Sequence, residues 1–483
     1  MIESRFITFI LGIFLTILAV AMTIPAAMDL LYHDPDWIYF GESAAITGFV
    51  GILLTLAFQP EGEPVFEVRE TFVLTVSAWV MISLFAALPF MLSSAAPTFT
   101  DAFFEAISGL TTTGATVFRD LDYAPPGILL WRALLQWLGG IGIVVMAMTI
   151  LPALKIGGMQ LFQSEFSDRS EKYFPRVSQI ASAILSTYLL MSILCGVAYW
   201  LAGMRPFDAI CLMMSTVSTA GFATSDLSLG YFDSFWIEFI AIVFMIMGSI
   251  TLLLFTRLLQ GDPKPLWRDS QARFFLALIA MATSIMVLWL WATDQYDPLS
   301  CLRHGAFAVV SIATTTGFTT ADFNTWGGFA LVFLFLLMFV GGCTGSTAGG
   351  IKIFRFQILF KAAKQQILQL RRPHGVFVPL YNNQKLKESV FMSVLAFFAL
   401  YILCYGTLAL SLSLCGLDVI SSLSGSATIL GNVGPGLGNE IGPSSIYSDL
   451  PDLAKWIIMF GMLVGRLELL TLLILFTPSF WRT

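Results

Sequence analysis

The chain has 483 residues, of which 57% are hydrophobic and 12% are charged, and its mean hydropathy is +0.82. This composition excludes a soluble protein and is typical of a protein that crosses a membrane many times. The formal net charge is −6. If the N-terminus is cytoplasmic and the apolar helices alternate in direction, most lysines and arginines fall on the cytoplasmic side. This bias predicts a multi-pass membrane protein with both termini in the cytoplasm.

About ten apolar segments are long enough to cross the bilayer, because a helical span takes roughly 20 residues. The first segment could instead be a signal peptide cleaved after Ala21, but its apolar run continues past that residue, which favours an uncleaved helix. The six cysteines show neither metal nor disulfide spacing. The polar stretch 361–386 is predicted to be a cytoplasmic connector. The predicted spans are residues 7–33, 38–58, 71–93, 128–152, 176–202, 234–258, 271–293, 327–340 and beyond, 387–415 and 454–477.

A short motif recurs four times, each time between two long apolar segments. Its copies read SGLTTTGAT, STVSTAGFAT, SIATTTGFTTAD and TILGNVGPG. Each copy follows an apolar stretch of about 10–13 residues, which suits a re-entrant helix better than a span. We align the copies on their glycines, and a hydroxyl residue then stands six positions before each of them. The glycines are Gly114, Gly221, Gly317 and Gly434, and the hydroxyl residues are Ser108, Ser215, Ser311 and Thr428.

Four re-entrant turns in one chain can surround a single axis, where irregular backbone lines a water-filled path. Each short helix would point the negative end of its dipole at the centre, which favours a cation. Backbone carbonyls of the turns would replace the hydration shell of the ion. None of the core turns contains a carboxylate, so a monovalent cation fits better than a divalent one. The predicted ion-binding residues are Thr112, Thr113, Gly114, Thr219, Ala220, Gly221, Thr315, Thr316, Gly317, Asn432, Val433 and Gly434.

These four turns resemble the filter segments of the Trk/Ktr/HKT superfamily of potassium transporters. The stretch RALLQWLGGIGI, from Arg132 to Ile143, looks like the second helix of the first repeat in that family. The resemblance covers about residues 68–483, and two additional N-terminal helices match the Trk branch with its TrkH and TrkG subunits. It implies an all-α polytopic membrane protein with four fused helix–re-entrant pore loop–helix repeats around a central pore. The implied units are 1–60, 68–160, 172–262, 268–372 and 384–483.

The stretch GGCTGSTAGGIK interrupts the second helix of the third repeat, because so many glycines and small polar residues cannot form a stable membrane helix. A glycine-rich helix-packing face is the alternative interpretation. By resemblance, this stretch is an intramembrane loop that gates the path, and Arg466 projects into the pore beside it. The alternative role for Arg466 is a structural ion pair. The implied gate residues are Gly341, Gly342, Cys343, Thr344, Gly345, Ser346, Thr347, Ala348, Gly349, Gly350, Lys352 and Arg466.

The resemblance implies potassium uptake across the bacterial inner membrane by a homodimer within the lipid bilayer. It also implies regulation by a separate cytoplasmic TrkA-like subunit that binds NAD or ATP. It implies no cofactor in this chain and no nucleic-acid partner, with potassium as the substrate. Glycine at position 114 favours potassium over sodium by analogy with plant relatives. A sodium- or proton-coupled symporter of another small cation stays open as an alternative. A membrane enzyme is disfavoured, because the only histidines are His33, His304 and His374 and no catalytic motif is present.

Overall fold

The computed structural model describes residues 4–60, 68–93, 97–149, 177–375, 377, 379–382, 384–386 and 388–482. The predicted end of the first pore repeat, at 160, and the predicted start of the second, at 172, fall within 150–176 and lie outside these residues. The fold is helical almost throughout the described chain, as the sequence predicts. Its only strands there are β1 (Leu380–Tyr381) and β2 (Gln384–Lys385), which form a small antiparallel hairpin.

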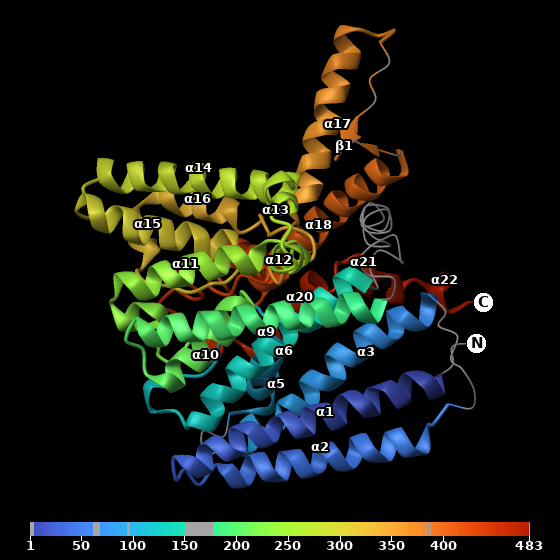
Figure 1. Cartoon of the computed structure of the whole chain (residues 1–483), viewed down its shortest axis with the longest axis vertical. Helices are drawn as coiled ribbons and strands as arrows, with labels where there is room; N and C mark the ends of the chain where they lie inside the picture. Colours follow the sequence, from blue (N-terminus) through green and yellow to red (C-terminus); the bar gives the residue numbers. More distant parts are fainter. Residues whose placement is uncertain are drawn as a thin grey trace.

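Two long N-terminal helices, α1 (Ser4–Leu31) and α2 (Trp37–Ala57), pack closely against each other. Small residues allow this approach. A Cβ atom on Gly12 would lie 2.6 Å from the hydroxyl of Thr55, and one on Gly51 would lie 2.7 Å from the backbone nitrogen of Thr16. The pair lies outside the four motif-bearing units, in blue along one edge of the bundle in Figure 1.

Each remaining unit contains a long helix, a short buried helix and a second helix that is either long or broken. The helices of the first two units are α3 (Val68–Ala86), α4 (Leu88–Leu92), α5 (Phe99–Leu110), α6 (Pro126–Thr149), α9 (Val177–Leu201), α10 (Pro206–Val217), α11 (Phe235–Ser249), α12 (Leu252–Leu259) and α13 (Lys264–Arg268). Those of the last two are α14 (Ser270–Ala292), α15 (Pro298–Ala313), α16 (Gly328–Leu337), α17 (Ile353–Arg371), α18 (Glu388–Leu414), α19 (Val419–Gly431), α20 (Asp452–Arg466), α21 (Leu470–Leu473) and α22 (Pro478–Trp481).

The short helices α5, α10, α15 and α19 begin with clear start signals. Thr98, Asp297 and Asp418 cap three of them by accepting a hydrogen bond from a backbone N–H in the first turn. The fourth, α10, has no side-chain cap but starts with Pro206, which has no N–H to leave unpaired. Three of the four have the expected length, with 12, 12 and 13 residues, whereas α15 is longer at 16.

The predicted spans at 234–258 and 454–477 are broken rather than continuous, whereas the break in the second helix of the third repeat was predicted from its glycine-rich sequence. Seven described helices are long and apolar enough to cross a membrane, and two further candidates are bent pairs, α11–α12 by 100° and α20–α21 by 109°. The apolar segment at 327–340 forms the ten-residue α16 and is followed by the predicted glycine-rich break. Hydropathy could not reveal the breaks after α11 and α20. At the first of them, a backbone carbonyl distant in sequence accepts a hydrogen bond from a freed backbone N–H. At the α11–α12 break, the backbone N–H of Leu252 donates to the Gly345 carbonyl at 3.1 Å.

Figure 1 shows the long helices lying side by side, with the beginning of α1 and the final α22 at the same end of the bundle. The short helices and the residues that follow them meet in the interior. Helix α17 departs from this arrangement and projects away from the bundle, with the β1–β2 hairpin near its base. The chain is also broken after α11, α16 and α20.

Candidate functional site

The four short helices end in the same backbone geometry. Two positions before each aligned glycine, the residue adopts a left-handed conformation, with φ between 51° and 57°. The next N–H donates back to the carbonyl six positions before the glycine, over 2.8–3.0 Å in all four copies. This is a helix C-terminal cap of the Schellman type. Three of the left-handed residues are threonines, for which positive φ is strained. The four left-handed residues are Thr112, Thr219, Thr315 and Asn432.

The hydroxyl residue six positions before each glycine fastens the turn to its own helix in three copies. Ser108 donates to the Ala115 carbonyl at 2.5 Å, and Ser311 donates to the Phe318 carbonyl at 2.6 Å. In the fourth copy Thr428 donates to Pro435 at 3.1 Å. The hydroxyl of Ser215 in the second copy is buried and has no hydrogen-bond partner within the described structure. The aligned hydroxyls therefore play one structural role, which the second copy has lost.

The aligned glycines close a ring. All four have positive φ, from 82° to 102°. A Cβ atom on Gly114 would lie 2.2 Å from the Ala220 carbonyl oxygen, one on Gly221 2.1 Å from that of Thr316, and one on Gly317 2.0 Å from that of Val433. A Cβ on Gly434 would lie 2.7 Å from the Thr113 oxygen, which completes the circle. Each turn thus presses against the next, and only glycine leaves room for this contact.

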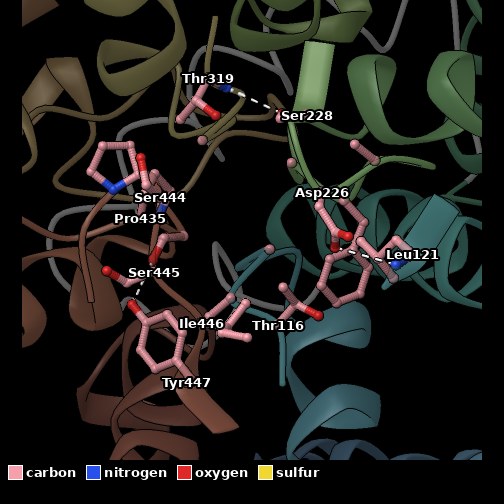
Figure 2. Close-up of a pocket in the computed structure, with 18 of the residues that line it drawn as sticks. Thr116, Leu121, Asp226, Ser228, Thr319, Pro435, Ser444, Ser445, Ile446 and Tyr447 are labelled. Atoms are coloured by element: carbon pink, nitrogen blue, oxygen red, sulfur yellow. Dashed lines mark hydrogen bonds between the residues drawn. The ribbon is translucent and has the colours of Figure 1, made fainter. Parts of the chain in front are cut away.

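A pocket of about 320 Å³ opens above this ring, and all four turns contribute to it. Figure 2 shows its walls, with Thr116 and Asp226 on one side and Pro435 and Tyr447 on the other. Its charged lining residues are Arg119, Asp120, Arg132 and Asp226. No group of three or more His, Cys, Asp or Glu side chains in the described chain could hold a metal ion. The site therefore offers backbone carbonyls and hydroxyls rather than a carboxylate cage.

The glycine-rich stretch after α16 lies directly beneath the ring. It is non-helical through 341–350, as the sequence predicts. The backbone N–H of Gly349 donates to the Thr315 hydroxyl at 2.7 Å, and the Thr347 hydroxyl lies 3.1 Å from that of Thr219. A Cβ on Gly349 would meet the Gly431 carbonyl at 2.2 Å. This intramembrane loop therefore contacts the second, third and fourth turns from below.

Two buried cationic side chains reach the intramembrane loop. Arg466, the last residue of α20, donates to the Thr347 carbonyl at 3.0 Å, and the ammonium of Lys352 donates to the Ala348 carbonyl. Arg466 does not pair with Glu468, which instead forms an ion pair with Arg355 at 2.5 Å. The Nε and Nη2 atoms of Arg466 are buried and have no partner within the described structure. Positive charge is therefore held under the ring by carbonyl oxygens.

The TrkH family profile, described as a cation transport protein, matches residues 42–483. The chain belongs to the TrkH family. It is 43% identical to the Trk system potassium uptake protein TrkI of Halomonas elongata, over 98% of this chain and 96% of that protein. It is 38% identical to TrkH of Escherichia coli K12, with 99% of both chains covered.

The fold agrees with a solved structure of this family. The crystal structure of the potassium transporter TrkH from Vibrio parahaemolyticus superimposes with a TM-score of 0.92 at 37% identity, covering 99% of each chain. Membership of the TrkH family makes the chain a multi-pass membrane protein of a cation transport family. The resemblance drawn from the four turns is thereby confirmed at the level of family and fold.

The structure brings every predicted site residue to one place. The twelve turn residues form or adjoin the ring, and the loop, Lys352 and Arg466 lie beneath it. Sequence reasoning missed the buried side chains that contact the backbone of the turns from the surrounding helices. Buried Arg132 pairs with Glu105 at 2.7 Å and donates to the Ala223 carbonyl at 2.9 Å. A charged residue in the middle of RALLQWLGGIGI and an acid within an apolar short helix are the signals that could have revealed this pair.

Gln136 is a second missed residue in the TrkH fold. Its side-chain amide donates to the Ala220 carbonyl at 2.7 Å, and its side-chain oxygen accepts from the Phe222 N–H at 3.1 Å. One side chain of α6 thus brackets the second turn on both sides of its glycine. The guanidinium of Arg132 also stacks 4.1 Å from the centre of the Phe222 ring. The first unit therefore supports the backbone of the second.

Proposed function

We propose that this protein takes up potassium across the bacterial inner membrane through the ring formed by Gly114, Gly221, Gly317 and Gly434. The relatives named above are potassium uptake proteins, which supports potassium as the substrate. The observation that carries the proposal is the closed contact of four turns, each glycine against the carbonyl of the next. Rigid carbonyls around a narrow axis can replace the water around a potassium ion and fit the smaller sodium ion less well.

The sign of the ion follows from the helices around the ring. The C-terminal ends of α5, α10, α15 and α19 meet there, and each carries partial negative charge. Asp120 and Asp226 line the pocket above, where they raise the local concentration of cations. The lining cation Arg132 is neutralised by Glu105. Potassium would therefore enter from the side of this pocket and pass through the ring.

The intramembrane loop at 341–350 is proposed as the gate, with Lys352 and Arg466 as its charged elements. It fills the space beneath three of the turns, and conduction requires it to move. Helix α17 begins at Ile353, immediately after the loop, and projects from the bundle. A cytoplasmic TrkA-like subunit that binds NAD or ATP could move the loop by binding this helix.

We also propose that the protein is a homodimer with cytoplasmic termini. Symport of potassium with sodium or protons is a variant of the same proposed function.

Ion flux into proteoliposomes containing the purified full chain tests this proposal. Potassium and rubidium should enter well above sodium, and Gly317→Ala should abolish this preference while the protein still inserts. A pH or sodium gradient that drives potassium uphill would identify symport, whereas passive flux would identify a channel-like path. Equal sodium and potassium uptake by the unaltered protein would contradict a potassium filter in the ring.

A further inference from the structure

The four turns differ in how they are stiffened. In the first turn the hydroxyls of Thr111 and Thr113 hydrogen bond to each other at 2.8 Å. The third turn repeats this bond between Thr314 and Thr316, also at 2.8 Å. The second turn has Ala220 in place of the second threonine. The fourth turn has neither hydroxyl, because its two positions are glycine and valine. Two opposite turns are thus tied internally and the two between them are not.

The turns without this tie are held from outside. Gln136 brackets the second turn, as described above. The fourth turn is held by Tyr447, whose hydroxyl donates to the Gly434 carbonyl at 2.8 Å. The carbonyls of the other three aligned glycines accept no hydrogen bond within the described residues. Gly434 also has the largest φ of the four, at 102°, so its peptide departs most from the common geometry.

Tyr447 itself is fixed in place by the first unit. It begins the short 3-10 helix η5 (Tyr447–Asp449), and its backbone N–H donates to the Thr116 carbonyl at 3.0 Å. Arg119 donates to the Ser448 hydroxyl at 3.0 Å and pairs with Asp449. Figure 2 shows the Tyr447 ring beside Ile446 at the edge of the pocket. A short strap, residues 446–449, therefore fastens the fourth turn to the first across the pocket mouth.

The chemistry of the tyrosine suits this role. Its side chain is 3% exposed and packs against Phe104, with the ring centres 5.6 Å apart. Burial raises the pKa of Tyr447 above its ordinary value, so the hydroxyl stays protonated and continues to donate. A carbonyl held by such a bond resists moving toward the axis. Closing around sodium requires that inward movement, because sodium is the smaller ion.

We propose that Tyr447 is a specificity-determining positioning residue, which fixes the fourth turn of the proposed potassium filter by holding the Gly434 carbonyl. This inference rests on the proposed potassium filter. Loss of the Tyr447 hydroxyl frees the Gly434 carbonyl to approach a smaller ion, while the four-turn ring and the helices stay in place. Selectivity should then fall with little change in the maximal rate of potassium uptake.

The test compares Tyr447→Phe with the unaltered protein in proteoliposomes, using potassium, rubidium and sodium. The potassium-to-sodium ratio of initial uptake rates should fall by about three- to tenfold, the effect expected from one neutral hydrogen bond. The KM for potassium should rise while the maximal rate is retained. The matched control is Tyr123→Phe, since Tyr123 lies in the outer segment of the first unit, is 90% exposed and is not part of the strap.

A second variant covers the case in which Tyr447→Phe destabilises the protein. Arg119→Gln removes the side-chain contacts of Arg119 with the strap but keeps the tyrosine hydroxyl. It should lower the potassium-to-sodium ratio by a smaller factor than Tyr447→Phe does. If neither variant changes the potassium-to-sodium uptake ratio, the proposed role of Tyr447 is wrong, but the proposed potassium filter is not contradicted. Equal uptake of both ions by the unaltered protein would overturn the filter and this inference together.

Discussion

The guanidinium of Arg466 donates to the Thr347 carbonyl at 3.0 Å, directly beneath the four-turn ring. Thr347 is itself fixed, because its hydroxyl shares its one hydrogen between the carbonyl oxygens of Val217 and Gly248, at 3.1 and 3.0 Å. The arginine is 3% exposed and its other donors have no partner within the described structure. A fixed positive charge is thus attached to the loop that we propose as the gate.

Replacing Arg466 by alanine should speed potassium flux. A positive charge about 5 Å from a passing cation raises its energy by about 3 kcal/mol at an effective dielectric constant of ~20. Each 1.36 kcal/mol corresponds to about tenfold in rate, so a gain of tenfold or more is expected. Arg466→Lys should keep much of the block, since the charge persists. The measurement is flux per folded protein, with the melting temperature recorded on the same samples.

A purely structural arginine gives the opposite pattern. Arg466→Ala would then lower the melting temperature, because the Thr347 carbonyl loses its donor, and flux would not rise. Lys352→Met provides a comparison, since Lys352 donates to the neighbouring Ala348 carbonyl. Faster flux in both variants indicates electrostatic obstruction by two charges. Loss of stability without faster flux in Arg466→Ala defeats the electrostatic account.

Alanine substitutions of the ring glycines should differ in severity. The added methyl group would approach a carbonyl oxygen to 2.0 Å at Gly317 and 2.1 Å at Gly221, but only to 2.7 Å at Gly434. Gly317→Ala and Gly221→Ala should abolish selective flux, and Gly434→Ala should keep the most. Uptake ratios for potassium and sodium check this order. Gly41→Ala is the control, because a Cβ there meets nothing within 4 Å; equal effects at all four ring positions would contradict the order.

Thr347→Val should loosen the intramembrane loop. The substitution removes the hydroxyl bonds to Val217, Gly248 and Thr219 but keeps the carbonyl that faces Arg466. Potassium flux should rise several-fold and the melting temperature should fall, because each lost buried hydrogen bond costs about 1 kcal/mol. Thr344→Val is a matched control in the same loop, since the Thr344 hydroxyl is buried without a partner in the described chain. A similar response of both variants would show that the bonds of Thr347 do not restrain a gate.

Much of this fold can be predicted from the sequence because its signals are local. Apolar length identifies the spans, and the recurring glycine turns identify the residues that meet at the ring. The glycine-rich break after α16 could also be predicted, but the breaks after α11 and α20 could not. The bend after α11 depends on the Thr251 hydroxyl donating to the Thr344 carbonyl at 2.7 Å, a contact across 93 positions of sequence. Gln136 and Tyr447 were missed for the same reason, because their partners lie in another turn or beyond a long loop.

The buried pair of Glu105 and Arg132 should support the ring through its charges. Glu105 also accepts from the Thr116 hydroxyl and the Val117 N–H, both at 2.9 Å, so it orders the chain just beyond the first glycine. Both side chains are at most 1% exposed. Removing one partner of such a pair leaves an uncompensated buried charge, which costs about 3–5 kcal/mol.

Arg132→Met should therefore lower the melting temperature strongly and abolish flux, because the carboxylate of Glu105 is left without its cation. Adding Glu105→Gln to that variant should recover part of the stability, since the remaining groups are neutral. A double-mutant cycle on the melting free energies measures the coupling. The surface pair Arg119–Asp449 is the control, with side chains 52% and 73% exposed, and its neutralisation should change stability by less than about 1 kcal/mol. Additive losses at Glu105 and Arg132 would mean that the two charges do not stabilise each other, and that packing alone holds this side of the ring.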